Sequence, residues 1–72
     1  MSLVKRSFSL LGHQTSVALE PEFWTVLERL AQSQGKTLTH LVRDLDEGRG
    51  EAPLASTARL AALSFALGEV HR

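Results

Sequence analysis

The stretch that decides the fold reads His13-Gln14-Thr15-Ser16-Val17-Ala18-Leu19. Thr15, Val17 and Leu19 alternate with polar or small residues, and alternate residues of a strand point to opposite faces of a sheet. The pattern predicts a half-buried strand over residues 13–19. A slip of one residue would turn Val17 and Leu19 toward water, so the direction of burial is fixed.

Upstream of this strand, residues 4–10 also alternate in part, and Gly12 permits a tight connection between the two stretches. Two interpretations of residues 1–12 stay open at this point. They form either an extra strand against residues 13–19 or a loose N-terminal arm.

Downstream, a first helix is predicted over residues 21–34. Pro21 suits the first helical position, and Glu22 places a negative charge near the positive end of the helix dipole. Gly35 supplies a C-terminal stop. The apolar residues of this segment follow one helical face: Phe23, Trp24, Val26, Leu27, Leu30 and Ala31. We expect Phe23 and Trp24 to pack in a dimer.

A second helix is predicted over residues 37–47, with Thr37 as a good N-cap. Its apolar residues recur at i, i+3, i+4 and i+7, which places them in one stripe: Leu38, Leu41, Val42 and Leu45. Acidic residues crowd its last turn, where the helix dipole disfavours anions, so we expect a weak end near Gly48.

A third helix is predicted over residues 55–70, with Ser56 as its cap. Its apolar stripe is wide: Leu60, Leu63, Leu67 and Val70, broadened by Ala61, Ala62, Phe65 and Ala66. So wide a surface requires a partner, and covering the core of a dimer is its simplest use.

Composition limits the class of protein. A chain of 72 residues fits one domain with a small hydrophobic core, which favours a homodimer. The absence of cysteine excludes disulfides and thiolate metal sites and is compatible with the cytoplasm. No apolar run approaches the roughly 18 residues that span a membrane, and no targeting segment is expected. The net charge is zero, yet Lys5 and Arg6 stand in a segment, residues 1–19, without acids.

The order of strand, helix, Gly35-Lys36-Thr37-Leu38-Thr39 and second helix resembles the ribbon-helix-helix family of dimeric DNA-binding proteins. More narrowly, Lys5-Arg6-Ser7, Gly12-His13 and Phe23-Trp24 are similar to a bacterial subfamily of small stand-alone domains, in which the third helix belongs to the domain. The whole chain, residues 1–72, is then one domain.

The resemblance implies a mainly α-helical, intertwined homodimer whose intermolecular antiparallel β-ribbon enters the major groove of double-stranded DNA to regulate transcription. The implied base-contacting residues are Gln14, Ser16 and Ala18. The implied phosphate-binding residues are Lys36, Thr37, Leu38 and Thr39, with Lys5 and Arg6 as reinforcement. Gln14 can pair with adenine and Ser16 can donate or accept, whereas Ala18 can touch only a thymine methyl group.

The alternative function is a dimeric protein-interaction module, antitoxin-like or an adaptor, that binds a protein partner through the apolar third helix. No catalytic set of nucleophile, base and orienting group has a defensible spacing, so an enzyme is not expected. No cofactor is implied. His13, His40 and His71 lack the spacing of a metal site.

Overall fold

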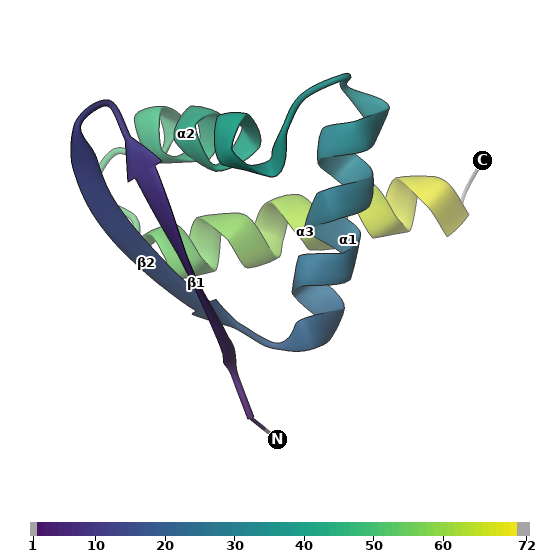
Figure 1. Ribbon diagram of the computed structural model, residues 1–72. Coiled ribbons are helices and arrows are strands. Elements are labelled where there is room, and N and C mark those ends of the chain that lie inside the picture. Colours follow the sequence, from purple (N-terminus) through teal and green to yellow (C-terminus); the bar gives the residue numbers. More distant parts are fainter. Residues whose placement is uncertain (1, 71–72) are drawn as a thin grey trace.

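Two strands at the start of the chain pair with each other in the computed structural model, which describes residues 2–70. Strand β1 (Val4–Leu10) lies antiparallel to β2 (His13–Leu19) in the register Ser7 opposite Ser16. Helices α1 (Pro21–Ser33), α2 (Leu38–Gly48) and α3 (Leu54–Val70) follow (Figure 1). The open question about residues 4–10 is therefore answered, because they form the extra strand.

The connection between the strands is a two-residue turn, Leu11-Gly12. Both residues have positive φ, 49° for Leu11 and 85° for Gly12. A turn with positive φ at both central positions has the twist that matches a right-handed β-hairpin. The antiparallel ribbon expected between two chains is thus formed within one chain. Each strand keeps one edge that pairs with no other strand of the described residues, and the homodimer stays a prediction.

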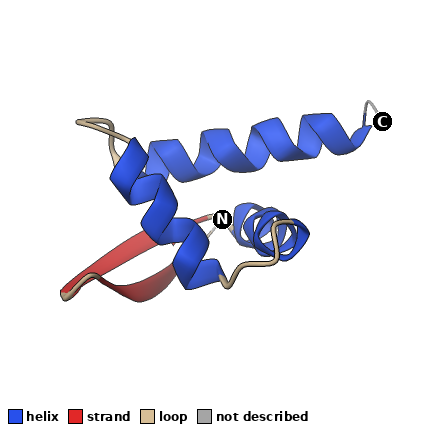
Figure 2. Ribbon diagram, turned by 90° about the horizontal axis from the view of Figure 1, so that it is seen from above, coloured by secondary structure: helices blue, strands red, loops and turns tan. Residues whose placement is uncertain are grey.

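The three helices cover one face of the hairpin, and the other face is exposed to solvent (Figures 1 and 2). Phe8 and Leu10 of β1 and Val17 and Leu19 of β2 point toward the helices, as the alternation in residues 13–19 predicts. The helices complete the buried core with side chains from all three: Trp24, Leu27 and Ala31 from α1, Leu41 and Val42 from α2, Ala58 and Ala62 from α3.

Trp24 is the residue that fastens the ribbon to α1. Its ring lies 5.9 Å from the ring of Phe8, and its indole N–H donates to the Val4 carbonyl oxygen at 2.7 Å. The side chain is 4% exposed within a single chain. The expected dimer packing of Trp24 is corrected, since the hairpin already covers it. Phe23 is half-buried, under the guanidinium of Arg59.

Helix α1 ends at Ser33, and Gly35 follows with φ of 66°. Thr37 then caps α2, because its hydroxyl oxygen accepts from the backbone N–H of His40 at 3.1 Å. Helix α2 ends at Gly48, and the weakness expected of its acidic last turn stays a prediction. Arg49 folds back on Asp46 at 2.7 Å and donates to the Ala52 carbonyl oxygen, so cationic groups offset the unfavourable dipole interaction.

Helix α3 corrects the cap expected at Ser56. It begins at Leu54, and the Pro53 carbonyl oxygen accepts the first helical N–H, from Thr57, so Ser56 lies inside the helix and does not cap it. Its buried contacts come from Ala58 and Ala62, while the leucine stripe is exposed in the single chain, and its predicted use in covering the core of a dimer stays a prediction. Small alanines allow α3 to approach α1 closely, and this approach decides which face is buried. Within residues 2–70, no helix is both long and apolar enough to cross a membrane.

Candidate nucleic-acid interface

The solvent face of the hairpin carries six side chains in three cross-strand pairs. The register places Lys5 opposite Ala18, Ser7 opposite Ser16, and Ser9 opposite Gln14. All are exposed except Ala18, which is half-buried. We call these six residues the ribbon face. Because strand residues alternate between faces, this face turns away from the helices and is free to meet another surface.

Hydrogen-bonding groups dominate the ribbon face. At its centre the Ser7 and Ser16 hydroxyl oxygens are 3.0 Å apart, and either one can donate to the other. A hydroxyl both donates and accepts, and the amide of Gln14 does both through two atoms. Short side chains also let the strands approach a base edge closely. The predicted base-contacting residues Gln14, Ser16 and Ala18 therefore share one surface with β1 residues.

Ser7 and Ser9 are the members of the ribbon face that the sequence reasoning missed. Their signal was present, because Ser7 and Ser9 alternate with the apolar Phe8 and Leu10. The sequence alone did not decide whether residues 4–10 form a strand or a loose arm. Side chains alternate between two defined faces only in a strand, so this signal could not be assigned to a face. Once the turn at Gly12 closes, the two strands have matching polar sides.

Lys5 is the charged member of the ribbon face. Of the seven described Lys and Arg residues, six have a carboxylate oxygen 2.6–3.8 Å from a side-chain nitrogen, and Lys5 has none among residues 2–70. A cation that no carboxylate neutralises attracts phosphate more strongly than a paired one. The overall neutral chain thus leaves one positive charge available on this face.

Arg6, which the sequence analysis grouped with Lys5, lies on the opposite face. Its guanidinium sits 5.1 Å from the centre of the Trp24 ring, and Nη1 donates to a Glu28 carboxylate oxygen at 3.3 Å. Neighbouring strand residues point in opposite directions, so Lys5 and Arg6 separate. Arg6 links the ribbon to α1, and we leave it out of the ribbon face.

The start of α2 is the second predicted contact with DNA. The first N–H groups of a helix have no intrahelical acceptor. The Thr37 hydroxyl oxygen accepts from the N–H of His40. The N–H groups of Leu38 and Thr39 remain available to a ligand. Lys36 Nζ donates to Asp44 Oδ2 at 2.6 Å. This bond, more than the charges of Lys36, His40 and Arg43, holds the pKa of Asp44 below its ordinary value. A phosphate bound at this helix start would compete with the Asp44 carboxylate for the Lys36 ammonium group.

The structure does not bring the two predicted contacts together in one chain. The α2 start follows the loop after α1 and lies away from the hairpin turn (Figure 1). Lys36 and Leu38 line a shallow groove with α1 residues such as Thr25 and Gln32. The ribbon face, in contrast, is directed away from the helices.

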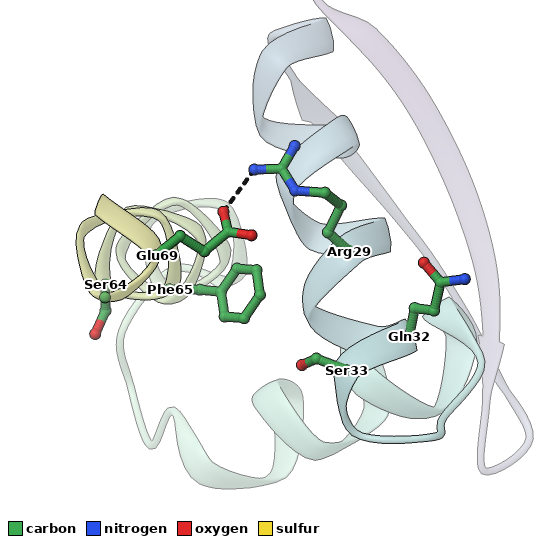
Figure 3. Close-up of a pocket in the computed structure, with 7 residues that line it drawn as sticks. Arg29, Gln32, Ser33, Ser64, Phe65 and Glu69 are labelled. Carbon is green, nitrogen blue, oxygen red and sulfur yellow. Dashed lines mark hydrogen bonds and ion pairs between the residues drawn. The ribbon is translucent and has the colours of Figure 1, made fainter. Parts of the chain in front are cut away.

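A further groove of about 640 Å³ lies between α1 and α3. Phe65 forms its floor, and Arg29 reaches across to Glu69, with 2.7 Å between Nη2 and Oε1 (Figure 3). That hydrogen bond raises the pKa of Arg29. The remaining lining is small or polar: Gln32, Ser33, Ser64 and Gly68. Among residues 2–70, no three metal-ligating side chains gather into a group.

A two-stranded antiparallel ribbon followed by helices, with a polar outer face, defines a class of DNA-binding domains. A family model described as ribbon-helix-helix domain matches residues 3–66. The chain therefore belongs to the ribbon-helix-helix family. Membership indicates a DNA-binding or regulatory role in general, and domains of this family generally bind DNA and dimerise.

One solved structure shares this fold along nearly the whole chain. It is an uncharacterized protein from Bordetella pertussis Tohama I, with 37% sequence identity and a TM-score of 0.82. The match covers 97% of this chain and 60% of that protein, so the chain spans less than two thirds of its relative. No curated protein matches the sequence.

Proposed function

We propose that the protein is a DNA-binding transcriptional regulator whose hairpin enters the major groove with the ribbon face toward the bases. The observation that carries the proposal is the ribbon face itself. It combines hydrogen-bonding side chains at alternate positions with Lys5, the described cation that has no acidic partner. As a transcriptional regulator, the protein would act in the bacterial cytoplasm, where the DNA is.

Groove dimensions support a ribbon made by a single chain. The major groove is about 12 Å wide and admits two strands, which lie about 4.8 Å apart. Two hairpins joined edge to edge would make four strands, whose outer backbones span about 14 Å before side chains are counted. Such a sheet exceeds the groove, so each hairpin reads DNA by itself.

Within this arrangement, Gln14 is the main reader of sequence. A glutamine amide can make paired hydrogen bonds with adenine, and Ser7, Ser9 and Ser16 can donate to or accept from any base edge. Lys5 contacts a phosphate. Lys36, Thr37, Leu38 and Thr39 grip a second phosphate with helix amides, provided that Lys36 leaves Asp44.

The test is fluorescence anisotropy with duplexes recovered by repeated selection from random DNA. Each phosphate contact contributes about −0.9 to the slope of log affinity against log salt. With few free cations, we expect a shallow slope. Lys5→Ala should reduce that slope by about 1 per ribbon and weaken binding to all duplexes alike.

Gln14→Ala should instead relax the sequence preference at one base pair, with a loss of about 1–3 kcal/mol for the preferred duplex. The matched control is Gln32→Ala, which removes the same side chain from an exposed position on α1. Equal affinities for Gln14→Ala and Gln32→Ala, or no selected DNA at all, would contradict the proposal.

A protein-interaction module is the second candidate function, and one observation favours it: the exposed leucine stripe of α3. Exposed apolar patches that are contiguous mark surfaces for protein contact. This surface does not overlap the ribbon face, so a protein contact and DNA binding are compatible in one chain.

A further inference from the structure

The tip of the hairpin holds a leucine in a backbone conformation that leucine disfavours. Among residues 2–70, Leu11 is the non-glycine residue with positive φ, at 49°. The Cβ atom of an L-residue is crowded in this region, and asparagine, aspartate or glycine usually occupies this position of a two-residue turn. For a bulky residue the conformation is a genuine outlier. The turn therefore keeps a large apolar side chain where the backbone does not favour it.

Packing within the chain does not account for this leucine. Its side chain is 70% exposed, more than any other large apolar side chain outside α3, and it is not among the described residues that pack on the core. The turn also borders open space, since a Cβ atom added at the neighbouring Gly12 would meet nothing within 4 Å. Strained residues cluster at sites of binding and catalysis. Leu11 is therefore a candidate contact residue.

We propose that Leu11 contacts the C5-methyl group of a thymine in the major groove. This inference deepens the proposed DNA contact and rests on it. The turn forms the end of the ribbon (Figure 1), so a hairpin that lies in the groove brings Leu11 to the DNA as well. Among the groups that base pairs display in the major groove, the thymine methyl is the apolar one. Leucine has no hydrogen-bonding side-chain atom, so it distinguishes thymine through this methyl group.

The lengths of the side chains along the hairpin fit this contact. At the centre of the ribbon face, Ser7 and Ser16 are short and permit a close approach to the bases. Leu11 lies four residues from Ser7, which is about 13 Å along a strand. The groove winds once around the DNA axis in about 34–36 Å, so its floor curves away from a ribbon that touches it at the centre. A longer side chain at the tip spans the gap that opens there.

The surroundings of Leu11 favour DNA over a protein partner. Its exposed neighbours on the hairpin, Ser9, His13 and Gln14, are polar. A protein contact calls for a contiguous apolar patch, and the hairpin tip has none among these residues. A thymine methyl is likewise a single apolar group among hydrogen-bonding atoms. One apolar side chain between polar ones therefore matches the chemistry of the groove.

The experiment measures the affinity of the full chain for a selected duplex in which each thymine is replaced in turn by deoxyuridine. This replacement removes only the methyl group. Fluorescence anisotropy should show a loss of about fourfold at one thymine, the value for burying one methyl-sized group. Leu11 and Gln14 are three residues apart, so this thymine should lie about two or three base pairs from the adenine that Gln14 reads.

Substitutions of Leu11 assign the sensitive thymine to this side chain. Leu11→Asn relieves the backbone and Leu11→Ala does not, yet both should bind the thymine and deoxyuridine duplexes equally at that position. A shared effect of these two variants separates DNA contact from stability. Leu11→Met keeps a long apolar side chain and should retain the fourfold loss. The matched control is Leu3→Asn, which removes an exposed leucine beside the other end of β1 and should behave as the wild type.

Two results would overturn the assignment, and they have different consequences. Specific binding with the same deoxyuridine sensitivity in the wild type and Leu11→Asn would exclude the thymine contact and leave the proposed DNA contact intact. The same result is expected if Leu11 contacts another protein. Absence of any salt-dependent binding to DNA would overturn the proposed function and this contact together.

Discussion

Leu11→Asn should stabilise the protein, although it removes a large apolar side chain. Leu11 is the first central residue of the hairpin turn and has φ of 49°, where its Cβ atom crowds the backbone. Asparagine tolerates this conformation and is the favoured partner of glycine in such a turn. Leu11 is also 70% exposed, so little burial is lost on substitution.

Two opposing contributions set the size of the effect. The left-handed conformation costs an ordinary L-residue about 1–2 kcal/mol, and asparagine avoids most of that cost. Full burial of a leucine side chain contributes roughly 1.5–3 kcal/mol, and the covered fraction of Leu11 is under a third. The lost burial therefore amounts to about 0.5–0.9 kcal/mol. We expect a net gain of about 0.5–1 kcal/mol in the free energy of unfolding, which is a rise of about 2–8 °C in Tm.

Urea unfolding followed by the fluorescence of Trp24 measures this gain, because Trp24 packs against Phe8 of the hairpin. All samples need the same protein concentration, since a dimer makes apparent stability depend on it. Leu11→Ala is the matched control: it loses the same contacts but keeps the unfavourable φ, so it should be less stable than the wild type. If both variants are destabilised equally, side-chain contacts and not backbone conformation govern this turn.

Two further predictions concern contacts between the hairpin and α1 and the pH dependence of stability. Trp24→Phe should lower the free energy of unfolding by about 1–2 kcal/mol, because it deletes the hydrogen bond to Val4 and weakens the stacking of Arg6. Hydrogen exchange should show faster exchange of the backbone amides in β1 before other elements are affected. Unchanged exchange in β1 would refute the role given to the indole N–H. A backbone hydrogen bond and Arg59 hold the pKa of Glu20 below its ordinary value of 4.5. The charged form is therefore favoured in the folded state, and Glu20→Gln should be less stable than the wild type at neutral pH. The difference should vanish as pH falls through and below the folded-state pKa; a difference independent of pH in urea titrations would contradict this.

Local patterns in the sequence account for most of the fold. The alternation over residues 13–19 predicted which side chains of β2 are buried, and the structure places Val17 and Leu19 in the core. Thr37 was predicted as an N-cap, and its hydroxyl accepts from the N–H of His40. Such features depend on residues within one turn or one strand, so the sequence displays them directly.

The candidate site was only partly predictable. Gln14, Ser16 and Ala18 were chosen from β2 alone, and the structure adds Ser7 and Ser9 through the register of a second strand. Lys5 and Arg6 are adjacent in sequence but lie on opposite faces. Their separation follows from the pairing of β1, which alternation in residues 4–10 did not decide by itself.

By itself, the sequence determined the elements of this protein: an alternating strand, three helical stripes and the residues that begin and end them. Only the tertiary structure decided which partner each apolar face meets. The hairpin covers Trp24 within one chain, and Ala58 and Ala62 bring α3 close to its neighbours. The reason is that a helix which is apolar on all sides has no preferred face until packing selects one. Packing selected the small residues of α3, and the leucines were left on the outside.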